Sequence, residues 1–371
     1  MIEITSLDTP PSLARTASSP TTQSSTTQSS TAPSSTAPSS TAQSSTTPSS
    51  RPALRVGVVQ HRWHPDAAAL HAELDEGIGR AARLGAAVVF LPELTLSRYP
   101  ADTLPENDAA GGGTTRPRPS DIAEDLFTGP TFRFAADAAR KHGICVHASL
   151  YQKAENPDGA DDGLGLNTAI LVSPGGELLA RTHKLHIPVT AGYYEDKFFR
   201  QGPDGDDAYE VHAPAELGGA RLGMPTCWDE WFPELARIYS LGGAELLVYP
   251  TAIGSEPDHP DFDTQPLWQQ VIVGNGIANG LFMVVPNRWG SEGTLNFYGS
   301  SFISDPYGRI LAQAPRDESA VIVADLDLDQ RRDWLTLFPF LATRRPDTYG
   351  RLTEPVRADA PLGSDTSKAN A

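Results

Sequence analysis

Hydrophobic and polar positions alternate in blocks along the chain from residue 54 onward. Residues 54–59 and 86–91 are apolar runs that predict buried strands, and 66–84 carry apolar residues at helical spacing. A strand, a helix and a second strand in this order predict a right-handed βαβ unit. A helix over 131–141 and a strand over 144–150 continue the alternation.

After residue 160 the pattern changes to pairs of strands joined by tight turns. Residues 167–172 and 177–184 flank Ser173-Pro174-Gly175-Gly176, and 301–304 and 309–314 flank a second turn, so two hairpins are predicted. The other predicted strands are 209–212, 221–226, 245–249, 281–286 and 321–326, and the other predicted helices are 232–241 and 266–279. Inner strands and outer helices predict an α/β fold with mixed sheets in layers.

The two ends of the chain have a different composition from its centre. Residues 1–50 are dominated by Ser, Thr, Pro, Ala and Gln, and 21–50 repeat pentapeptides such as TTQSS and TAPSS. Such a segment has too little apolar surface to offset its ordering entropy, which predicts a disordered leader. A mucin-like stalk, or a true start codon near Arg51, are alternatives. One domain is predicted over 51–352, followed by a flexible polar tail over 353–371.

Charge and composition exclude several classes of function. The net charge of −17 disfavours nucleic-acid binding, which needs a basic face. The chain holds no run of 18 apolar residues, so no membrane span is expected. Two cysteines and no signal-like segment predict a cytoplasmic protein without a disulfide framework.

Three reactive side chains each follow a predicted buried strand: Glu93, Lys184 and Cys227. Ligands of open α/β sheets bind beyond the carboxyl ends of the strands, so these side chains are candidates for one site. The carboxylate can take the thiol proton, and the ammonium can stabilise a thiolate and a later oxyanion. The turn after Cys227 begins a helix, which would aim backbone N–H groups at that oxyanion.

Each of these residues alone also has a structural interpretation. A glutamate after a strand is usually solvated, and a lone buried cysteine is usually an apolar filler, as we predict for Cys145. His183 and His186 flank Lys184, but their spacing does not match a helical zinc motif. No phosphate loop or dinucleotide fingerprint occurs, so neither a metal nor a cofactor is predicted.

Three motifs occur in the order seen in the nitrilase, or carbon–nitrogen hydrolase, superfamily, which the chain resembles over residues 55–327. The motifs are Phe90-Leu91-Pro92-Glu93, His183-Lys184-Leu185-His186-Ile187-Pro188 and Cys227-Trp228-Asp229-Glu230-Trp231-Phe232-Pro233-Glu234. The resemblance implies an α-β-β-α sandwich. It also implies that Glu93 is the general base, Lys184 the electrostatic stabiliser and Cys227 the nucleophile, with the Trp228 N–H facing the oxyanion.

Four further motifs resemble the N-carbamoylputrescine amidohydrolase branch. They are Gly192-Tyr193-Tyr194-Glu195, Tyr249-Pro250-Thr251-Ala252-Ile253-Gly254, Pro286-Asn287-Arg288-Trp289-Gly290 and Phe297-Tyr298-Gly299-Ser300-Ser301-Phe302-Ile303. Glu195 occupies the place of a second glutamate that positions substrate or water. The chain departs from these relatives at Glu230, where they carry Gln, and at Leu267, where they carry His.

The resemblance implies a thiol amidohydrolase that cleaves N-carbamoylputrescine or a similar ureido compound through a Cys thioester. Ammonia and carbon dioxide would be released, and the enzyme would be a homo-oligomer. A β-ureidopropionase-like or aliphatic amidase activity, or a non-catalytic scaffold with this fold, are the alternatives. The partner expected in each enzymatic case is a small ureido or amide compound.

Five residues are candidates for substrate binding: Tyr194, Asp229, Glu230, Thr251 and Arg288. Acidic side chains near the nucleophile would favour a cationic tail. Asp229 and Glu230 have an alternative role, because acidic residues often cap the start of a helix. Arg288 would either bind an anionic tail or brace a loop.

Overall fold

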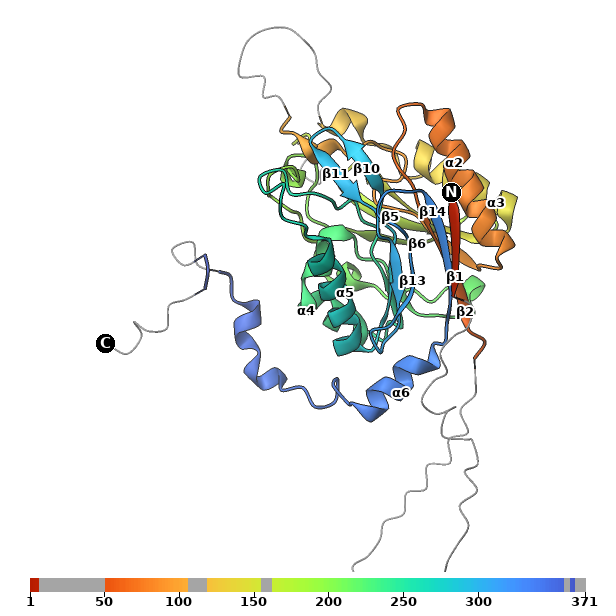
Figure 1. Ribbon diagram of the computed structural model, residues 1–371. Coiled ribbons are helices and arrows are strands. Elements are labelled where there is room, and N and C mark those ends of the chain that lie inside the picture. Colours follow the sequence, from red (N-terminus) through yellow and green to blue (C-terminus); the bar gives the residue numbers. More distant parts are fainter. Residues whose placement is uncertain (7–50, 106–118, 155–161, 357–360, 364–371) are drawn as a thin grey trace, which may run out of the picture.

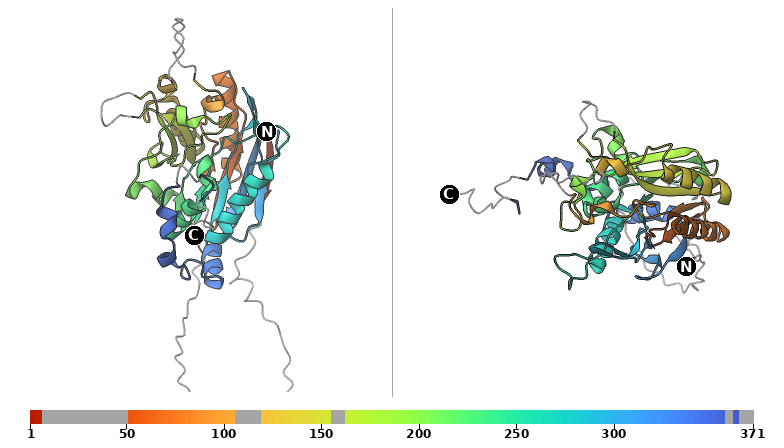
Figure 2. Two further views of the ribbon diagram at one scale, coloured as in Figure 1. Left: turned by 90° about the vertical axis from the view of Figure 1, so that its left-hand side faces the viewer. Right: turned by 90° about the horizontal axis from the view of Figure 1, so that it is seen from above.

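The computed structural model describes residues 1–6, 51–105, 119–154, 162–356 and 361–363. Two mixed sheets face each other, with α2 and α3 on the outer side of one and α4 and α5 on the outer side of the other (Figures 1 and 2). The α-helices of the described residues are α2 (Ala67–Arg83), α3 (Pro130–His142), α4 (Pro233–Leu241), α5 (Gln265–Asn279) and α6 (Asp329–Leu337). The first four match the helices predicted from apolar periodicity.

The larger sheet has seven strands in the order β1-β14-β2-β3-β4-β5-β6. They are β1 (Ile2–Ser6), β2 (Leu54–Gln60), β3 (Val88–Phe90), β4 (Cys145–Gln152), β5 (Leu166–Val172), β6 (Leu178–His183) and β14 (Ala320–Leu326). The predicted βαβ unit is present, since β2 pairs with β3 in parallel across α2. The first predicted hairpin is present as the antiparallel pair β5–β6.

The smaller sheet has five strands in the order β13-β12-β9-β8-β7. They are β7 (Leu222–Gly223), β8 (Leu246–Val248), β9 (Phe282–Val285), β12 (Phe302–Ser304) and β13 (Ile310–Gln313). The pair β12–β13 is the second predicted hairpin. A separate two-stranded ribbon, β10 (Trp289–Glu292) and β11 (Leu295–Tyr298), rises at one end (Figure 1).

Three apolar layers hold the fold together. Strand side chains of both sheets, such as Val58 and Val284, interlock between the sheets. The opposite faces pack on the helices, as Val59 does beneath α2 and α3 and Met283 beneath α4 and α5. Because strands of both sheets are buried on both faces, they read as continuous apolar runs in the sequence. The predicted α-β-β-α sandwich is confirmed.

Some elements differ from the sequence-based expectation. Residues 1–6 were assigned to a disordered leader, but 2–6 form β1, which pairs in parallel with β14 at the sheet edge. Most side chains of β1 are exposed, so the segment lacks the continuous apolar run that predicts a buried strand. The rest of that leader, 7–50, lies outside the described residues, as does most of the predicted tail.

The strand predicted over 209–212 is also wrong. Residues 206–209 form a 3-10 turn, and His212 makes only a single bridge to Leu222. Within the described ranges no helix is long and apolar enough to cross a membrane. The cytoplasmic location and the absence of a nucleic-acid partner stay predictions.

Candidate active site

The three reactive side chains come from turns that follow strands of both sheets. Glu93 lies three residues after β3, Lys184 directly after β6, and Cys227 four residues after β7. Glu93 and Lys184 belong to the larger sheet and Cys227 to the smaller one. All three side chains are buried, so the sandwich brings them together in a site that excludes bulk water.

Lys184 is the centre of this group. Its ammonium donates to Glu93 Oε1 at 3.0 Å and to Glu195 Oε2 at 2.6 Å. The side chains of all three residues are almost fully buried. Burial lowers the pKa of Lys184, but Glu195, Glu93 and the neighbouring Cys227 outweigh it and hold the pKa well above its usual value. The two carboxylates therefore favour the charged ammonium.

Glu93 is oriented by two further donors. The amide of Asn167 on β5 donates to Oε1 at 2.7 Å, and the backbone N–H of Ala252 donates to Oε2 at 3.0 Å. With Lys184, three donors fix a carboxylate that has no exposed surface. Such a fixed acceptor beside a thiol is suited to act as a general base.

Cys227 has a strained backbone, with φ of +44°, and opens the 3-10 helix Cys227–Trp231. Its own N–H donates to Pro250 O at 3.0 Å, which anchors the turn. A positive φ in a non-glycine residue is costly and is found most often at functional sites. Burial and then Glu93 raise the pKa of the Cys227 thiol well above its usual value, so the thiol is neutral until a base removes its proton.

A cavity of about 200 Å³ opens beside the sulfur. Cys227, Trp228 and Glu195 all lie in its wall, so the nucleophile and the second glutamate share one space. The other described lining residues are Pro188, Thr190, Tyr193, Trp231, Ile253, Glu256 and Thr264. Its size fits a small linear ureido or amide compound, whose apolar stem would lie against the aromatic walls.

Glu195 has the properties of a proton-exchanging group. Its Oε1 accepts from the Tyr99 hydroxyl at 2.7 Å, and its Oε2 accepts from Lys184. Burial, with Glu93 adding to it, raises the pKa of Glu195 to about 7 although Lys184 opposes the shift. Near neutral pH this carboxyl can therefore either hold or release a proton.

Arg288 braces the catalytic turn. It is fully buried, and its Nη2 donates to the carbonyl oxygens of Glu93 at 2.7 Å and Leu94 at 3.0 Å. Its Nη1 is paired with Glu292 at 2.7 Å. Leu94 has a φ of +49°, so the guanidinium stabilises a strained turn beside the base. Arg288 therefore braces this loop, and it is not among the described residues that line the cavity.

Asp229 caps the turn that carries the nucleophile. Its carboxylate accepts from the N–H of Thr226 at 3.0 Å and from the N–H of His186 at 2.9 Å. The interaction ties the Lys184 segment to the Cys227 turn. Asp229 therefore has the capping role that the sequence left open, and is not among the described residues of the cavity wall.

Tyr194, Thr251 and Glu230 are also not found among the described residues that line the cavity. Tyr193, the neighbour of Tyr194, takes that place. The Thr251 hydroxyl donates to Pro286 O at 3.0 Å and joins two strand ends. Substrate contact is therefore not supported for Tyr194 or Thr251.

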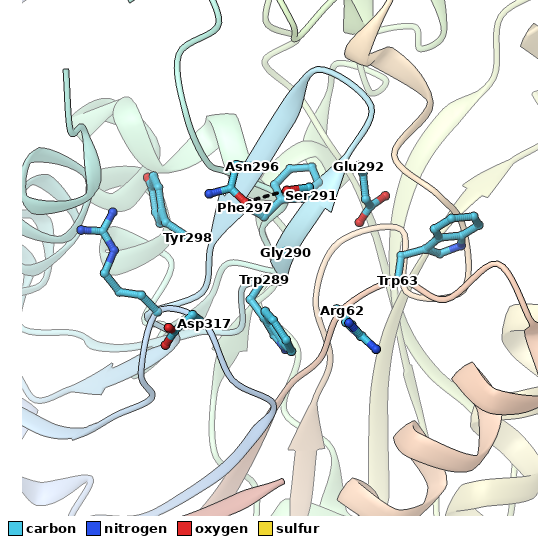
Figure 3. Close-up of a pocket in the computed structure, with 11 residues that line it drawn as sticks. Arg62, Trp63, Trp289, Gly290, Ser291, Glu292, Asn296, Phe297, Tyr298 and Asp317 are labelled. Carbon is cyan, nitrogen blue, oxygen red and sulfur yellow. Dashed lines mark hydrogen bonds between the residues drawn. The ribbon is translucent and has the colours of Figure 1, made fainter. Parts of the chain in front are cut away.

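A second and larger cavity, of about 920 Å³, lies on the β10–β11 ribbon (Figure 3). Arg62 stacks over Trp289 at 5.5 Å in its wall, and Trp63 lies beside them. Neither Cys227 nor Glu195 lines it. Its Glu292 forms an ion pair with Arg288, which in turn binds the Glu93 carbonyl oxygen. This cavity is therefore connected to the catalytic turn only through Arg288.

Four residues of the site were missed by sequence reasoning: Tyr99, Asn167, Tyr193 and Glu256. Asn167 and Tyr193 lie within segments that were quoted for other reasons. Tyr99 and Glu256 lie in loops without periodicity, so no pattern marks them. Among the described residues, no three His, Cys, Asp or Glu side chains are grouped to hold a metal ion.

The family model for carbon–nitrogen hydrolases matches residues 55–335. The chain belongs to this family. Citrullinase of Francisella tularensis is 32% identical over 306 residues, which cover 81% of this chain and 98% of that protein. N-carbamoylputrescine amidase of Solanum lycopersicum is 35% identical over 228 residues, 59% of this chain and 72% of that protein.

Solved structures agree with this assignment. A carbon–nitrogen hydrolase from Helicobacter pylori has a TM-score of 0.69 at 30% identity, covering 81% of this chain and 99% of that one. An amidase from Nesterenkonia sp. AN1 has a TM-score of 0.60 at 23% identity, covering 83% of this chain and 98% of that one, and shares the fold. This family member is thus a carbon–nitrogen hydrolase with amidase-type relatives.

Proposed function

We propose that this hydrolase cleaves the carbamoyl C–N bonds of N-carbamoylputrescine or a similar ureido compound with a cationic tail. The observation that supports it is the arrangement of Lys184 between two buried carboxylates, beside a cysteine that opens into a small cavity. N-carbamoylputrescine amidases and a citrullinase among the relatives also act on ureido groups, as their names state.

In the first half of the proposed reaction, Glu93 takes the proton of Cys227 as the sulfur attacks the ureido carbon. The tetrahedral oxyanion is stabilised by the Lys184 ammonium and the Trp228 N–H. Loss of one such donor typically costs about 100- to 1000-fold in rate. The C–N bond then breaks, ammonia leaves with the proton from Glu93, and an N-substituted carbamoyl thioester remains.

In the second half, Glu93 takes a proton from water as the water oxygen attacks the thioester carbon. The C–S bond breaks, the sulfur regains its proton from Glu93, and the released carbamate decomposes to the amine and carbon dioxide. Glu195 holds Lys184 in place and takes up or releases a proton near pH 7, as its raised pKa allows.

Recognition of a cationic tail rests on Glu256. Its side chain lies in the cavity wall that also holds Cys227, and Thr264 Oγ1 donates to it at 3.3 Å. No lysine or arginine of the described chain forms an ion pair with this carboxylate. His259 is its basic neighbour among the described residues. A half-buried carboxylate without a lysine or arginine partner is suited to bind an ammonium.

Replacing Glu256 by Gln is expected to raise KM for N-carbamoylputrescine about tenfold, with kcat changed less than about threefold, because the charge pair forms equally in ground and transition states. N-butylurea, which lacks the ammonium, serves as the matched substrate and should show no such rise. Ammonia release measures both. Equal KM changes for the two substrates would contradict the role of Glu256.

The same assay separates the candidate functions. The panel is N-carbamoylputrescine, citrulline, N-carbamoyl-β-alanine and a short aliphatic amide. Preference for citrulline would favour the activity named for the Francisella relative, which matches this chain over 98% of its own length. Preference for N-carbamoyl-β-alanine would support a β-ureidopropionase-like activity, and preference for the amide an aliphatic amidase. No ammonia from any of the four compounds would support a non-catalytic scaffold.

We also propose that the enzyme is a homo-oligomer. Ile238 and Leu241 on α4 are 39% and 47% exposed, and Leu337 and Phe338 at the end of α6 are 56% and 43% exposed. The segment after α6 extends away from the body (Figure 1). Exposed apolar groups of this kind are typical of an interface. Light scattering of the wild type should give a mass that is a multiple of 39.7 kDa. The double variant I238D/L241D should form a smaller particle. A monomeric wild type would contradict the proposed homo-oligomer.

A further inference from the structure

Glu230 is a buried carboxyl whose neighbouring side-chain donor among the described residues is the Trp268 indole N–H. It lies three residues after the nucleophile in the same 3-10 helix and has 0% exposure. Neither of its carboxyl oxygens has a donor in bonding geometry among the described residues. Its backbone oxygen accepts from Asn275 Nδ2 at 3.0 Å, which fixes this turn against α5. The carboxyl is therefore held away from bulk water in this structure.

The surroundings of the Glu230 carboxyl are aromatic. The indole N–H of Trp268 on α5 is the neighbour that best offsets the effect of its burial. Tyr298 on β11 and Tyr249 after β8 also face it, and burial followed by Glu230 raises the pKa of Tyr298 well above its usual value. These groups are neutral, so none of them can balance a negative charge.

The charged neighbours are Glu93, Asp229 and Lys184. Glu93 and Asp229 repel a charge on Glu230, and only the Lys184 ammonium attracts it. That ammonium is already bound by Glu93 and Glu195 at 3.0 Å and 2.6 Å. A third carboxylate would stand uncompensated in a dry site. Burial, with Glu93 adding to it, holds the pKa of Glu230 well above its usual range.

We propose that Glu230 is a positioning residue that acts through Cys227. It remains protonated at neutral pH, and its deprotonation disfavours formation of the Cys227 thiolate. Its proton passes to solvent, and one negative charge is added within one turn of Cys227. Thiolate formation places a negative charge on the sulfur, where Glu230 is one of the carboxylates that oppose it. A charge on Glu230 raises the pKa of the Cys227 thiol further, which disfavours that transfer.

The protonation half of the proposal can be tested without substrate. The infrared difference spectrum of wild type minus E230Q at neutral pH should contain the carbonyl band of a protonated carboxylic acid. The exposed Glu234 at the start of α4 gives a matched control. E234Q also removes a carboxyl group but should keep the band, so the difference spectrum of wild type minus E234Q should lack it. Absence of the band in the difference spectrum would overturn the proposal.

The functional half rests on the proposed thiol hydrolase activity and is measured by ammonia release. The ratio of kcat above the pH at which the wild-type band is lost to kcat at about pH 7.5 should be at least about threefold higher in E230Q than in wild type or E234Q. Glu195, with a pKa of about 7, also contributes a protonated carboxyl but is common to wild type and E230Q, so it cancels in their difference. Titration of the band in that difference spectrum should coincide with the loss of rate in wild type. Equal ratios in all three proteins, or a band that titrates apart from the rate, would overturn it.

Discussion

Replacing Cys227 by alanine is expected to lower kcat by about 10⁴-fold or more, because no thioester can form without the sulfur. Lys184 and Trp228 would remain to polarise a bound ureido group, so only the small activity of an oxyanion site is left. The measurement is ammonia release under saturating substrate. Substrate binding should survive, because the cavity wall loses one atom and Glu256 is untouched.

Cys145 provides the matched control, because the described chain has only these two free thiols and both are buried. Cys145 lies on β4 and packs between the two sheets, where burial raises its thiol pKa to about 12. C145A should keep wild-type kcat within about threefold. Mass spectrometry after iodoacetamide should show the label on Cys227. Label on Cys145 alone, or normal turnover of C227A, would contradict the assignment of the nucleophile.

The side chains that follow strands were predictable from the sequence, because a buried strand is an apolar run with a visible end. Glu93, Lys184 and Cys227 each follow such a run, and the resemblance to known motifs assigned their roles. Their three-dimensional arrangement was not predictable from periodicity. Strand order places β4 and β5 between the strands that carry Glu93 and Lys184. The gap is bridged by Asn167 on β5, whose amide contacts Glu93.

The residues that were missed lie where no periodic signal exists. Tyr99 and Glu256 sit in loops, and their positions depend on how those loops fold onto the sandwich. Residue type alone also could not separate a bracing role from a binding role. Arg288 and Asp229 carry charges that suit a substrate, yet both form hydrogen bonds with backbone groups of the catalytic turns. The sequence does not show which groups a buried charged side chain binds, whereas the folded structure does.

Two strained residues of the catalytic turns show how the site depends on this bracing. Cys227 and Leu94 both have positive φ values of +44° and +49°. Glycine would adopt them at lower cost, but the chemistry needs a side chain at position 227. Asp229 holds one turn through Thr226, and Arg288 holds the other through the Glu93 carbonyl. The strain is thus supported by buried charges that take no part in bond breaking.

Lys184 is the residue whose loss should affect stability as well as rate. Replacing it by methionine leaves Glu93 and Glu195 facing each other in a dry site without their shared cation. Removing one partner of a buried ion pair costs about 3–5 kcal/mol in free energy of unfolding. The loss of an oxyanion donor should in addition lower kcat about 100- to 1000-fold.

The stability loss of K184M should depend on pH in a defined direction. Without the ammonium, the folded-state pKa of Glu195 rises above its wild-type value of about 7, because Lys184 lowers this pKa more than the Tyr99 hydroxyl does. A carboxyl with a raised folded pKa stabilises the fold fully below its unfolded pKa, and this stabilisation is lost as pH rises through the folded pKa. The difference between K184M and wild type should therefore be smallest near about pH 5 and grow toward about pH 8.

Urea denaturation at those two pH values measures this difference. Lys141 offers a matched control, since it pairs with Asp75 at 2.5 Å but is 60% exposed. Because exposed pairs contribute about 0–1 kcal/mol, K141M should lose no more than that, and equally at both pH values. A deficit in K184M that is independent of pH would contradict the coupling of Lys184 to two buried carboxylates, even if turnover were lost.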